Sequence, residues 1–449
     1  MTRRTLPTDT ALPHPRPETR PVPAAFERRT VLRAPALAAL AAGAAGVAGS
    51  LGAQGLTNAA AAAENRQIAF RHWMNRRWLS EGTTQGLTFD GAGRLVIASS
   101  GWTRTTHEGR RYAGGTWHSP WVTESFAFTE LIASWKATTP DDSFVVVKVA
   151  GRDGSGRTSS WDTLAYWAAG DLKVSRRSYG PQSDDLAKVS VDTWQSHSSA
   201  GLRAYQLRVS LYRLAGANTP SPALSAVGAM TSRLPSTWSP SSHKGVVRTL
   251  DVPGYSQMIH TGHYPSFGGG GEAWCSPTSV SMVLGYYRRL PSAKSYAWVP
   301  SGHPVPWVDH AARMTYDHTY KGCGNWSFSA AYASQLVDTA YVTRLRSLRE
   351  AEEFIAQGIP LVASIRFGRG QLTGAPISAS NGHLLVIVGF DRSGNVVVND
   401  PAAPKAASVR RTYRRAEFER AWLPTSGGLV YVIHDAAHTP PSRAGRSNW

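Results

Sequence analysis

A cysteine stands where the sequence predicts that a helix begins. Cys275 lies in the segment 271–279, in which Ser276 suits an N-cap and Pro277 suits the first helical position. The thiolate is the nucleophilic form of cysteine, and a helix N-terminus carries partial positive charge and free backbone N–H groups. The position therefore favours ionisation of Cys275 and indicates a thiol enzyme.

Two residues far downstream could complete such a site. His383 opens one apolar run, Asp400 follows the next, and the Asp-Arg-Ser-Gly-Asn turn at 391–395 between the runs predicts a β-hairpin. Because the two ends of a hairpin meet, we expect the imidazole and the carboxylate to lie close together. The imidazole would accept the cysteine proton and the carboxylate would orient the ring. Asn399 is the alternative third member, but strand alternation points it opposite to Asp400.

The order of these residues resembles that of papain-like cysteine peptidases of the bacteriocin-leader-processing type, peptidase family thirty-nine of the cysteine class. The resemblance covers about residues 249–435. It implies that Cys275 is the nucleophile, that His383 is the general base and then the acid, and that Asp400 orients the ring. It also implies that the side-chain amide of Gln257 donates to the developing oxyanion beside the Cys275 backbone N–H.

The chain departs from this family in two respects. Family members usually carry the glutamine a short step before the cysteine, whereas here Cys275 stands eighteen positions after Gln257, with a glycine-rich stretch between them. Transporter-linked members are fused to membrane domains and cut leader peptides, and no such domain is evident in this sequence. The substrate is therefore not implied by the resemblance.

The pattern after residue 249 predicts an α+β domain. Apolar residues recur at helical spacing after Cys275, and strands are expected after the helices. The further helices are expected at 327–337 and 347–357, and the strands at 360–366, 383–390 and 395–399. Helices followed by an antiparallel sheet give a papain-like catalytic domain over 249–436. Residues 437–449 are expected to form a flexible tail.

The preceding half of the chain predicts an all-β domain. Short runs of β-branched and aromatic residues, separated by Gly, Asp and Ser turns, occupy residues 64–232 without helices between them. We expect a sandwich or jelly-roll-like accessory domain. A stretch rich in Ser and Pro at 233–248 then predicts a linker to the catalytic domain.

Ten of the sixteen tryptophans lie in this front half and its linker. Flat aromatic faces on a β-sandwich can stack on sugar rings, so a glycan-binding role is open, although most of these side chains are expected to fill the core. Trp117 and Trp121 bracket a loop-like His-Ser-Pro and are the expected surface platform.

The first 63 residues predict a twin-arginine export signal. Arg28 and Arg29 precede a weakly apolar stretch, and an alanine run at 59–63 offers small residues for cleavage. Glycines interrupt that stretch, which argues against a membrane anchor. We expect a secreted, extracellular or cell-wall associated protein whose mature chain has no membrane span.

The chain is basic, with a formal net charge of +18. The signal holds seven arginines and three acidic residues, so the mature chain keeps +14. This charge favours anionic partners such as cell-wall polymers or glycans, bound through the front domain. Lysines and arginines are scattered in no run longer than a pair, so no specific nucleic-acid partner is expected.

No cofactor or metal is expected. His260 and His263 in Ile-His-Thr-Gly-His could bind a metal ion, but no helix and no third ligand stand nearby in the sequence, so a substrate-side loop is the preferred interpretation. Cys275 and Cys323 are the two cysteines of the chain, and a structural disulfide between them is the alternative to catalysis.

We therefore predict an exported cysteine peptidase that hydrolyses amide or peptide bonds of a peptide or protein substrate through a Cys-His-Asp triad and an S-acyl intermediate. A cell-wall peptide hydrolase and a transglutaminase-like acyl transferase are the enzymatic alternatives, and incorporation of an amine would mark the second. The remaining alternative is a catalytically inert, surface glycan-binding protein.

Overall fold

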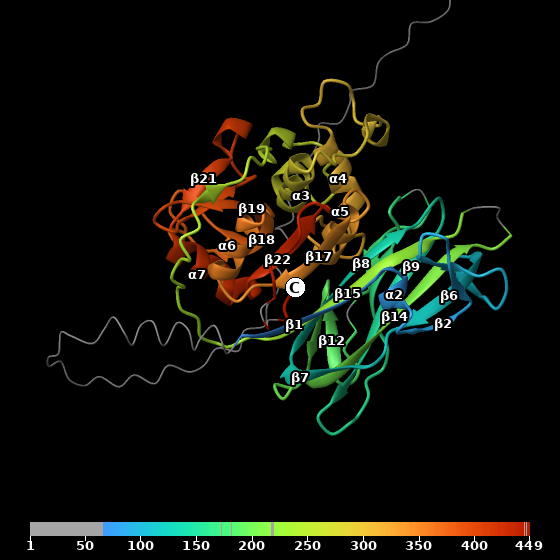
Figure 1. The fold of residues 1–449 in the computed structure, drawn as a ribbon. Helices are drawn as coiled ribbons and strands as arrows, with labels where there is room; N and C mark the ends of the chain where they lie inside the picture. Colours follow the sequence, from blue (N-terminus) through green and yellow to red (C-terminus); the bar gives the residue numbers. More distant parts are fainter. Residues whose placement is uncertain (1–65, 172, 181, 217–219, 444, 446) are drawn as a thin grey trace, which may run out of the picture. The chain divides into compact units, whose positions relative to one another are not determined.

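The computed structural model describes residues 66–449 apart from 172, 181, 217–219, 444 and 446 (Figure 1). The predicted export signal at 1–63 lies outside the described residues. Within the described part of the chain, no helix is both long and apolar enough to cross a bilayer.

The N-terminal half is built from two antiparallel β-sheets, which confirms the prediction of a β-rich front half (Figure 1). The first sheet has the order β12-β13-β8-β15-β4-β3, with β1 paired to β15. The second has the order β11-β10-β9-β14-β6-β2, with β5 on β6 and β7 on β14. The elements are β1 (Gln67–Met74), α2 (Asn75–Leu79), β2 (Thr83–Gln85), β3 (Leu87–Phe89), β4 (Leu95–Ile97), β5 (Thr103–His107), β6 (Arg110–His118), β7 (Val122–Phe128), β8 (Glu130–Thr138), β9 (Phe144–Asp153), β10 (Asp162–Trp167), β11 (Arg177–Ser178), β12 (Ala187–Ser190), β13 (Thr193–Ser196), β14 (Leu202–Leu214) and β15 (Ala223–Arg233).

Strand alternation decides which tryptophans enter the core. In β6 it turns Trp117 inward, where the side chain is fully buried and its indole N–H donates to the Leu79 carbonyl at 2.8 Å. The prediction that Trp117 forms a surface platform is therefore wrong, because Trp117 and His118 belong to strand β6 and Trp117 is not in a loop. Trp121 is half-buried, with the Arg152 guanidinium 3.8 Å from its ring centroid.

The C-terminal half combines helices with an antiparallel sheet of order β17-β22-β18-β19-β20-β21, on which β16 pairs with β19. The strands are β16 (Arg248–Thr249), β17 (Thr339–Arg344), β18 (Leu361–Phe367), β19 (Ser380–Phe390), β20 (Val396–Asn399), β21 (Arg410–Tyr413) and β22 (Leu429–His434). The helices are α3 (Cys275–Tyr286), α4 (Trp307–Thr315), α5 (Trp326–Ala333), α6 (Leu348–Ala356) and α7 (Arg415–Ser426), with 3-10 turns η1 (Met258–His260), η2 (Gly271–Ala273), η3 (Ala293–Tyr296) and η4 (Ala406–Ser408).

Strand β8 of the front half bonds directly to the C-terminal half. Ser134 Oγ accepts from the Val342 N–H at 2.9 Å, the Ser327 hydroxyl donates to the Ala133 carbonyl at 2.7 Å, and Lys136 Nζ donates to the Val337 carbonyl at 3.0 Å. Buried apolar residues from both halves also belong to one continuous hydrophobic cluster. The β-rich half is therefore packed against its neighbour and is more than a tethered module.

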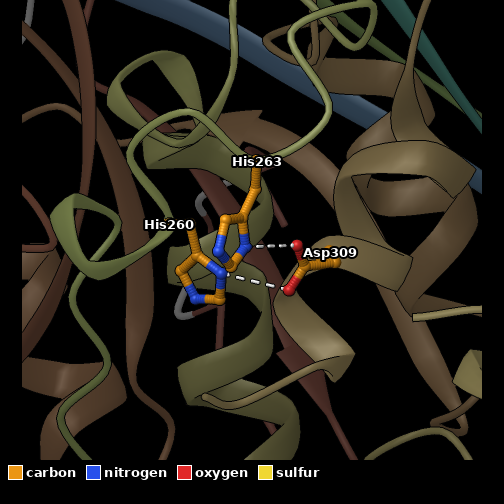
Figure 2. A group of neighbouring side chains, drawn as sticks. All are labelled: His260, His263 and Asp309. Carbon is orange, nitrogen blue, oxygen red and sulfur yellow. Dashed lines mark hydrogen bonds and ion pairs between the residues drawn. The ribbon is translucent and has the colours of Figure 1, made fainter. Parts of the chain in front are cut away.

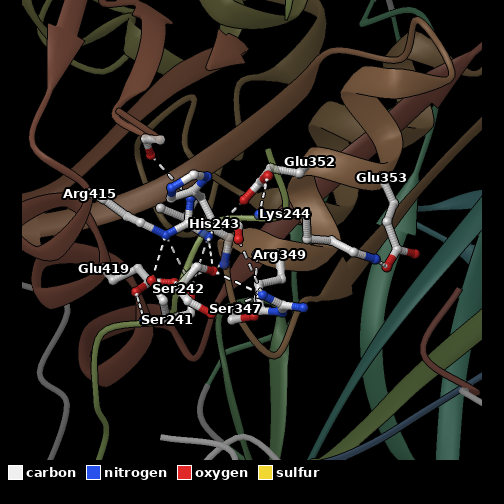
Figure 3. A network of polar contacts seen from close by, with 12 residues as sticks. Ser241, Ser242, His243, Lys244, Ser347, Arg349, Glu352, Glu353, Arg415 and Glu419 are labelled. Atoms are coloured by element: carbon white, nitrogen blue, oxygen red, sulfur yellow. Dashed lines mark hydrogen bonds and ion pairs between the residues drawn. The ribbon is translucent and has the colours of Figure 1, made fainter. Parts of the chain in front are cut away.

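The segment predicted as a linker is fastened to the C-terminal half by buried carboxylates (Figure 3). The N–H and hydroxyl of Ser241 each donate to the Glu419 carboxylate at 2.6 Å, and the Lys244 N–H donates to Glu352 at 2.7 Å. Glu352 and Glu419 are fully buried, and the Arg415 guanidinium lies 2.8 Å from Glu352. This segment is thus held by specific polar contacts.

Replacing Arg415 by methionine should lower the free energy of unfolding by about 3 kcal/mol, because Glu352 would remain buried without its counter-charge. Urea denaturation measures this loss. Arg414→Met is the matched control, since the Arg414 side chain is 75% exposed and its ion pair to Glu417 is long, at 3.6 Å. A change within about 0.5 kcal/mol is expected for the control. Equal losses in the two variants would contradict this account of the linker.

The C-terminal segment, predicted to be a flexible tail, ends in buried residues. Asn448 Nδ2 donates to the Arg344 carbonyl at 2.9 Å and to Glu350 at 2.8 Å. Trp449 is 2% exposed, and its ring lies 5.1 Å from that of Phe354. The prediction was wrong because the partners of these two side chains lie in β17 and α6, which the local sequence of the segment cannot indicate.

Candidate active site

Cys275 is the first residue of α3, and the helix is fixed against the sheet. Val280, Val283 and Leu284 of α3 are fully buried. The Ser279 hydroxyl donates to the Leu384 carbonyl in β19 at 3.1 Å. The start of the helix is therefore held beside the strand that carries His383.

The hairpin expected from the sequence is present. In the turn, the Asp391 N–H bonds to the Asn395 carbonyl, and β19 pairs with β20 in antiparallel register. His383 Nε2 lies 2.7 Å from Asp400 Oδ1, and both side chains are buried. The same imidazole also acts on the Cys275 thiol and lowers its pKa. The structure thus brings Cys275, His383 and Asp400 into one connected group.

Two further donors hold the Asp400 carboxylate. The Tyr413 hydroxyl donates to Oδ2 at 2.6 Å, and the Ala402 N–H donates to Oδ1 at 3.0 Å. Burial alone would raise the pKa of Asp400, but the charge of His383 and these hydrogen bonds hold the pKa below its usual range. The carboxylate is therefore kept ionised beside the ring.

The pKa of the Cys275 thiol is lowered and the pKa of the His383 imidazole is raised. Burial alone would raise the pKa of Cys275, but the hydrogen bond and charge of His383 and the backbone N–H groups of Leu384 and Ser276 lower it on balance. Burial alone would lower the pKa of His383, whereas Asp400 and Cys275 raise it well above its usual range. These shifts favour a thiolate next to an imidazolium.

Gln257 lies between the two segments that carry the cysteine and the aspartate. Its Nε2 donates to the Glu272 carbonyl at 2.5 Å, three residues before Cys275, and its backbone N–H donates to the Pro401 carbonyl at 2.8 Å. The side chain is buried. The intervening residues fold into a loop containing η1 and η2, so the long spacing in sequence does not separate Gln257 from the start of α3.

Asn399, the alternative third member, is engaged elsewhere. Its Nδ2 donates to the Val252 and Pro253 carbonyls at 3.0 and 3.1 Å, and its Oδ1 accepts from Arg410 Nε at 2.6 Å. Asp400 is the residue of this pair that contacts His383.

Cys323 lies apart from this chemistry. It is buried, its thiol donates to the Ala312 carbonyl at 3.4 Å, and burial raises the pKa of the thiol. Cys275 and Cys323 are both free thiols in the structure.

Sequence reasoning missed Tyr413. The residue ends β21, which pairs with β20 in antiparallel register, so its hydroxyl reaches Asp400 across the sheet. No motif marks it in the sequence. The alternation of β21 could have indicated an inward-facing tyrosine only after its pairing with β20 was known.

Comparisons with known proteins match both halves of the chain. Residues 69–232 match the family model "Peptidase C39 N-terminal domain", and residues 249–430 match the "Peptidase_C39 like family". No curated protein matches the chain.

Two solved structures show distant likenesses. Prointerpain A from Prevotella intermedia is 15% identical over 43% of this chain and 72% of that chain, with a TM-score of 0.24. The C-terminal family 22 carbohydrate binding module of Clostridium thermocellum Xyn10B is 12% identical over 37% of this chain and 94% of that chain, with a TM-score of 0.18. Both TM-scores are too low for the likeness to bear on fold or function.

Proposed function

Because the chain belongs to the C39-like peptidases and has their two-domain architecture, we propose that it hydrolyses peptide bonds with Cys275 as the nucleophile. One observation carries the proposal. The thiol at the start of α3 stands beside His383, which lowers the pKa of the thiol and is hydrogen-bonded in turn to the buried Asp400. This arrangement of nucleophile, base and orienting group is what thiol-dependent acyl transfer requires.

The proposed reaction proceeds in two halves. The Cys275 thiolate attacks the carbonyl carbon of the peptide bond, and the His383 imidazolium protonates the leaving amine as the C–N bond breaks. This step leaves an S-acyl enzyme. His383, now neutral, takes a proton from water as the water attacks the thioester, and the carboxylic acid and the thiolate are released. Asp400 stabilises the imidazolium in both halves.

The sequence and fold support the remaining parts of the proposal. Helix α3, with the nucleophile at its start, packs on an antiparallel sheet that supplies His383 and Asp400, which supports a papain-like α+β catalytic domain. The twin-arginine pattern supports export to the cell exterior. The charge of +14 after removal of the signal supports anionic cell-wall polymers or glycans as partners of the secreted chain.

Gln257 is proposed as a donor to the oxyanion, together with the Cys275 backbone N–H. One amide hydrogen of Gln257 is used by the Glu272 carbonyl, and a primary amide has a second. Gln257→Ala should therefore lower kcat by about 100-fold with little change in KM. Alkylation of Cys275 by iodoacetamide forms no oxyanion and should keep its rate. A parallel loss of alkylation would show that Gln257 instead holds the loop in place.

The proposed function is tested by peptide cleavage in ¹⁸O-labelled water. The full chain is incubated with a mixture of peptides and a primary amine, and the products are analysed by mass spectrometry. New C-termini that carry ¹⁸O, formed by the wild type and not by Cys275→Ala, are the expected result. Amine-capped products would identify an acyl transferase instead. Absence of cleavage together with absence of any S-acyl adduct would overturn the proposal.

A further inference from the structure

Two histidines and an aspartate converge in the loop that leads to Cys275. Figure 2 shows the rings of His260 and His263 directed at the carboxylate of Asp309. His260 Nδ1 lies 3.0 Å from Asp309 Oδ2, and His263 Nδ1 lies 3.0 Å from Asp309 Oδ1. One ligand atom from each residue lies within 4.8 Å of the other two. The local sequence around the two histidines lacks a third ligand. Helix α4 supplies one, the carboxylate of Asp309.

Hydrogen bonding accounts for only part of this cluster, because His263 Nδ1 and Asp309 Oδ1 form a hydrogen bond whereas the ring of His260 is left without one among the described residues. His260 and Asp309 are fully buried, and the side chain of His263 is 19% exposed. Within the described residues, the two ring nitrogens of His260 and Oδ2 of Asp309 have no hydrogen-bond partner. His260 Nδ1 and Asp309 Oδ2 nevertheless lie only 3.0 Å apart. The angle between the His260 ring and the carboxylate is therefore not that of a hydrogen bond. Buried polar atoms of this kind are costly unless another group satisfies them.

The donor set fits a small divalent metal ion. Zn²⁺ takes imidazole nitrogens at about 2.0 to 2.1 Å and carboxylate oxygens at about 2.0 to 2.2 Å in tetrahedral geometry, which places ligand atoms about 3.3 Å apart. Each histidine Nδ1 lies 3.0 Å from a different oxygen of Asp309, close to this value, and one ligand atom from each of the three residues lies within 4.8 Å of the others. We propose that His260, His263 and Asp309 form a zinc-binding site.

Its surroundings indicate a structural site. The complete burial of His260 and Asp309 leaves little access for a substrate, whereas iron sites built from two histidines and one carboxylate keep open positions for their reactants. The ring of His303 lies 4.1 Å from that of His263, and its Nδ1 is buried without a partner among the described residues. His303 is therefore a neighbour of the three proposed ligands and does not belong to the group whose ligand atoms converge.

The bound ion would tie the long loop before the nucleophile to α4. His260 belongs to η1, and its backbone contacts Gly271 of η2 so closely that no side chain fits there. Gln257 bonds to Glu272 in the same loop. Zinc would thus fasten the insertion that separates Gln257 from Cys275. The inference concerns metal binding and holds whether or not the chain is a peptidase.

The test is zinc titration of the full chain after treatment with a chelator. Cys275→Ala is used as the background, because a thiolate beside His383 could itself bind zinc. Isothermal titration should show one Zn²⁺ bound per chain, and zinc at about 100 times its Kd should raise Tm by several degrees over the chelator-treated sample. Co²⁺ in the same site should give d–d absorption without a thiolate charge-transfer band.

Ligand variants decide where the ion binds. In the Cys275→Ala background, His263→Gln and Asp309→Asn should each abolish uptake of one Zn²⁺ per chain and the rise in Tm. His197→Gln, an exposed histidine of the front half, should retain both. Circular dichroism confirms that each variant is folded, and His263 is chosen because it is the more exposed of the two histidine ligands. Failure of the folded background protein to bind Zn²⁺, or unchanged binding in His263→Gln and Asp309→Asn, would overturn the proposal.

Discussion

Replacing Cys275 by alanine should lower kcat/KM for peptide hydrolysis by about 10⁴-fold or more, because the variant lacks the sulfur atom that forms the acyl enzyme. The half-buried thiol lies at the start of α3 beside the imidazole, so its loss removes the reacting atom while leaving His383 and Asp400 paired. The measurement is steady-state kinetics on a peptide selected by the cleavage screen.

Cys323→Ala is the matched control for this experiment. Cys323 is buried, its thiol bonds to a backbone carbonyl, and its pKa is raised by burial, so it has no part in the proposed chemistry. The variant should lose about 1 kcal/mol of stability and keep kcat/KM near the wild-type value. Activity that survives in Cys275→Ala and disappears in Cys323→Ala would refute the assignment of the nucleophile.

Replacing Asp400 by asparagine should lower kcat by about 10³-fold. The negative charge of Asp400 is the main cause that raises the pKa of His383, and its Oδ1 fixes the ring through Nε2. An amide at this position removes the charge and can present N–H to the ring, and both changes destabilise the imidazolium. The imidazolium is needed to stabilise the thiolate and to protonate the leaving amine. Measured kcat values, with single-turnover acylation rates, test this prediction.

Tyr413→Phe separates the charge of Asp400 from its hydrogen bonding. The variant removes the donor to Oδ2 but keeps the carboxylate ionised, so kcat should fall only about tenfold.

A wild-type kcat in the Asp400→Asn variant would contradict the role given to Asp400.

Local signals were sufficient for the positions of the three proposed triad residues. The Asp391–Asn395 turn and the two apolar runs around it predict the hairpin, and the hairpin brings His383 to Asp400. The Ser-Pro pair after Cys275 predicts the start of a helix at Pro277, two residues after its observed start at Cys275. These features depend on residues close together in the sequence, which is why sequence alone could place them.

Contacts between distant segments could not be predicted in this way. Tyr413 reaches Asp400 only because β21 pairs with β20, and Asp309 meets His263 across 46 residues of chain. The burial of Trp117 in β6 and of Trp449 beside α6 depends likewise on partners far away in the sequence. Pairing of strands and packing of side chains decide these positions, and neither is encoded in a local pattern.

The pH dependence of Cys275 alkylation tests the central claim most directly. Iodoacetamide reacts with the thiolate, so the rate follows the ionised fraction of Cys275 in the wild type and in His383→Ala. Because His383 lowers the pKa of Cys275 against the effect of burial, the wild type should react well below the ordinary thiol pKa of about 8.5. In His383→Ala burial is no longer opposed by His383, and the midpoint should move upward. A midpoint near or above about 8.5 in the wild type, or the same midpoint in both proteins, would contradict an activated Cys275.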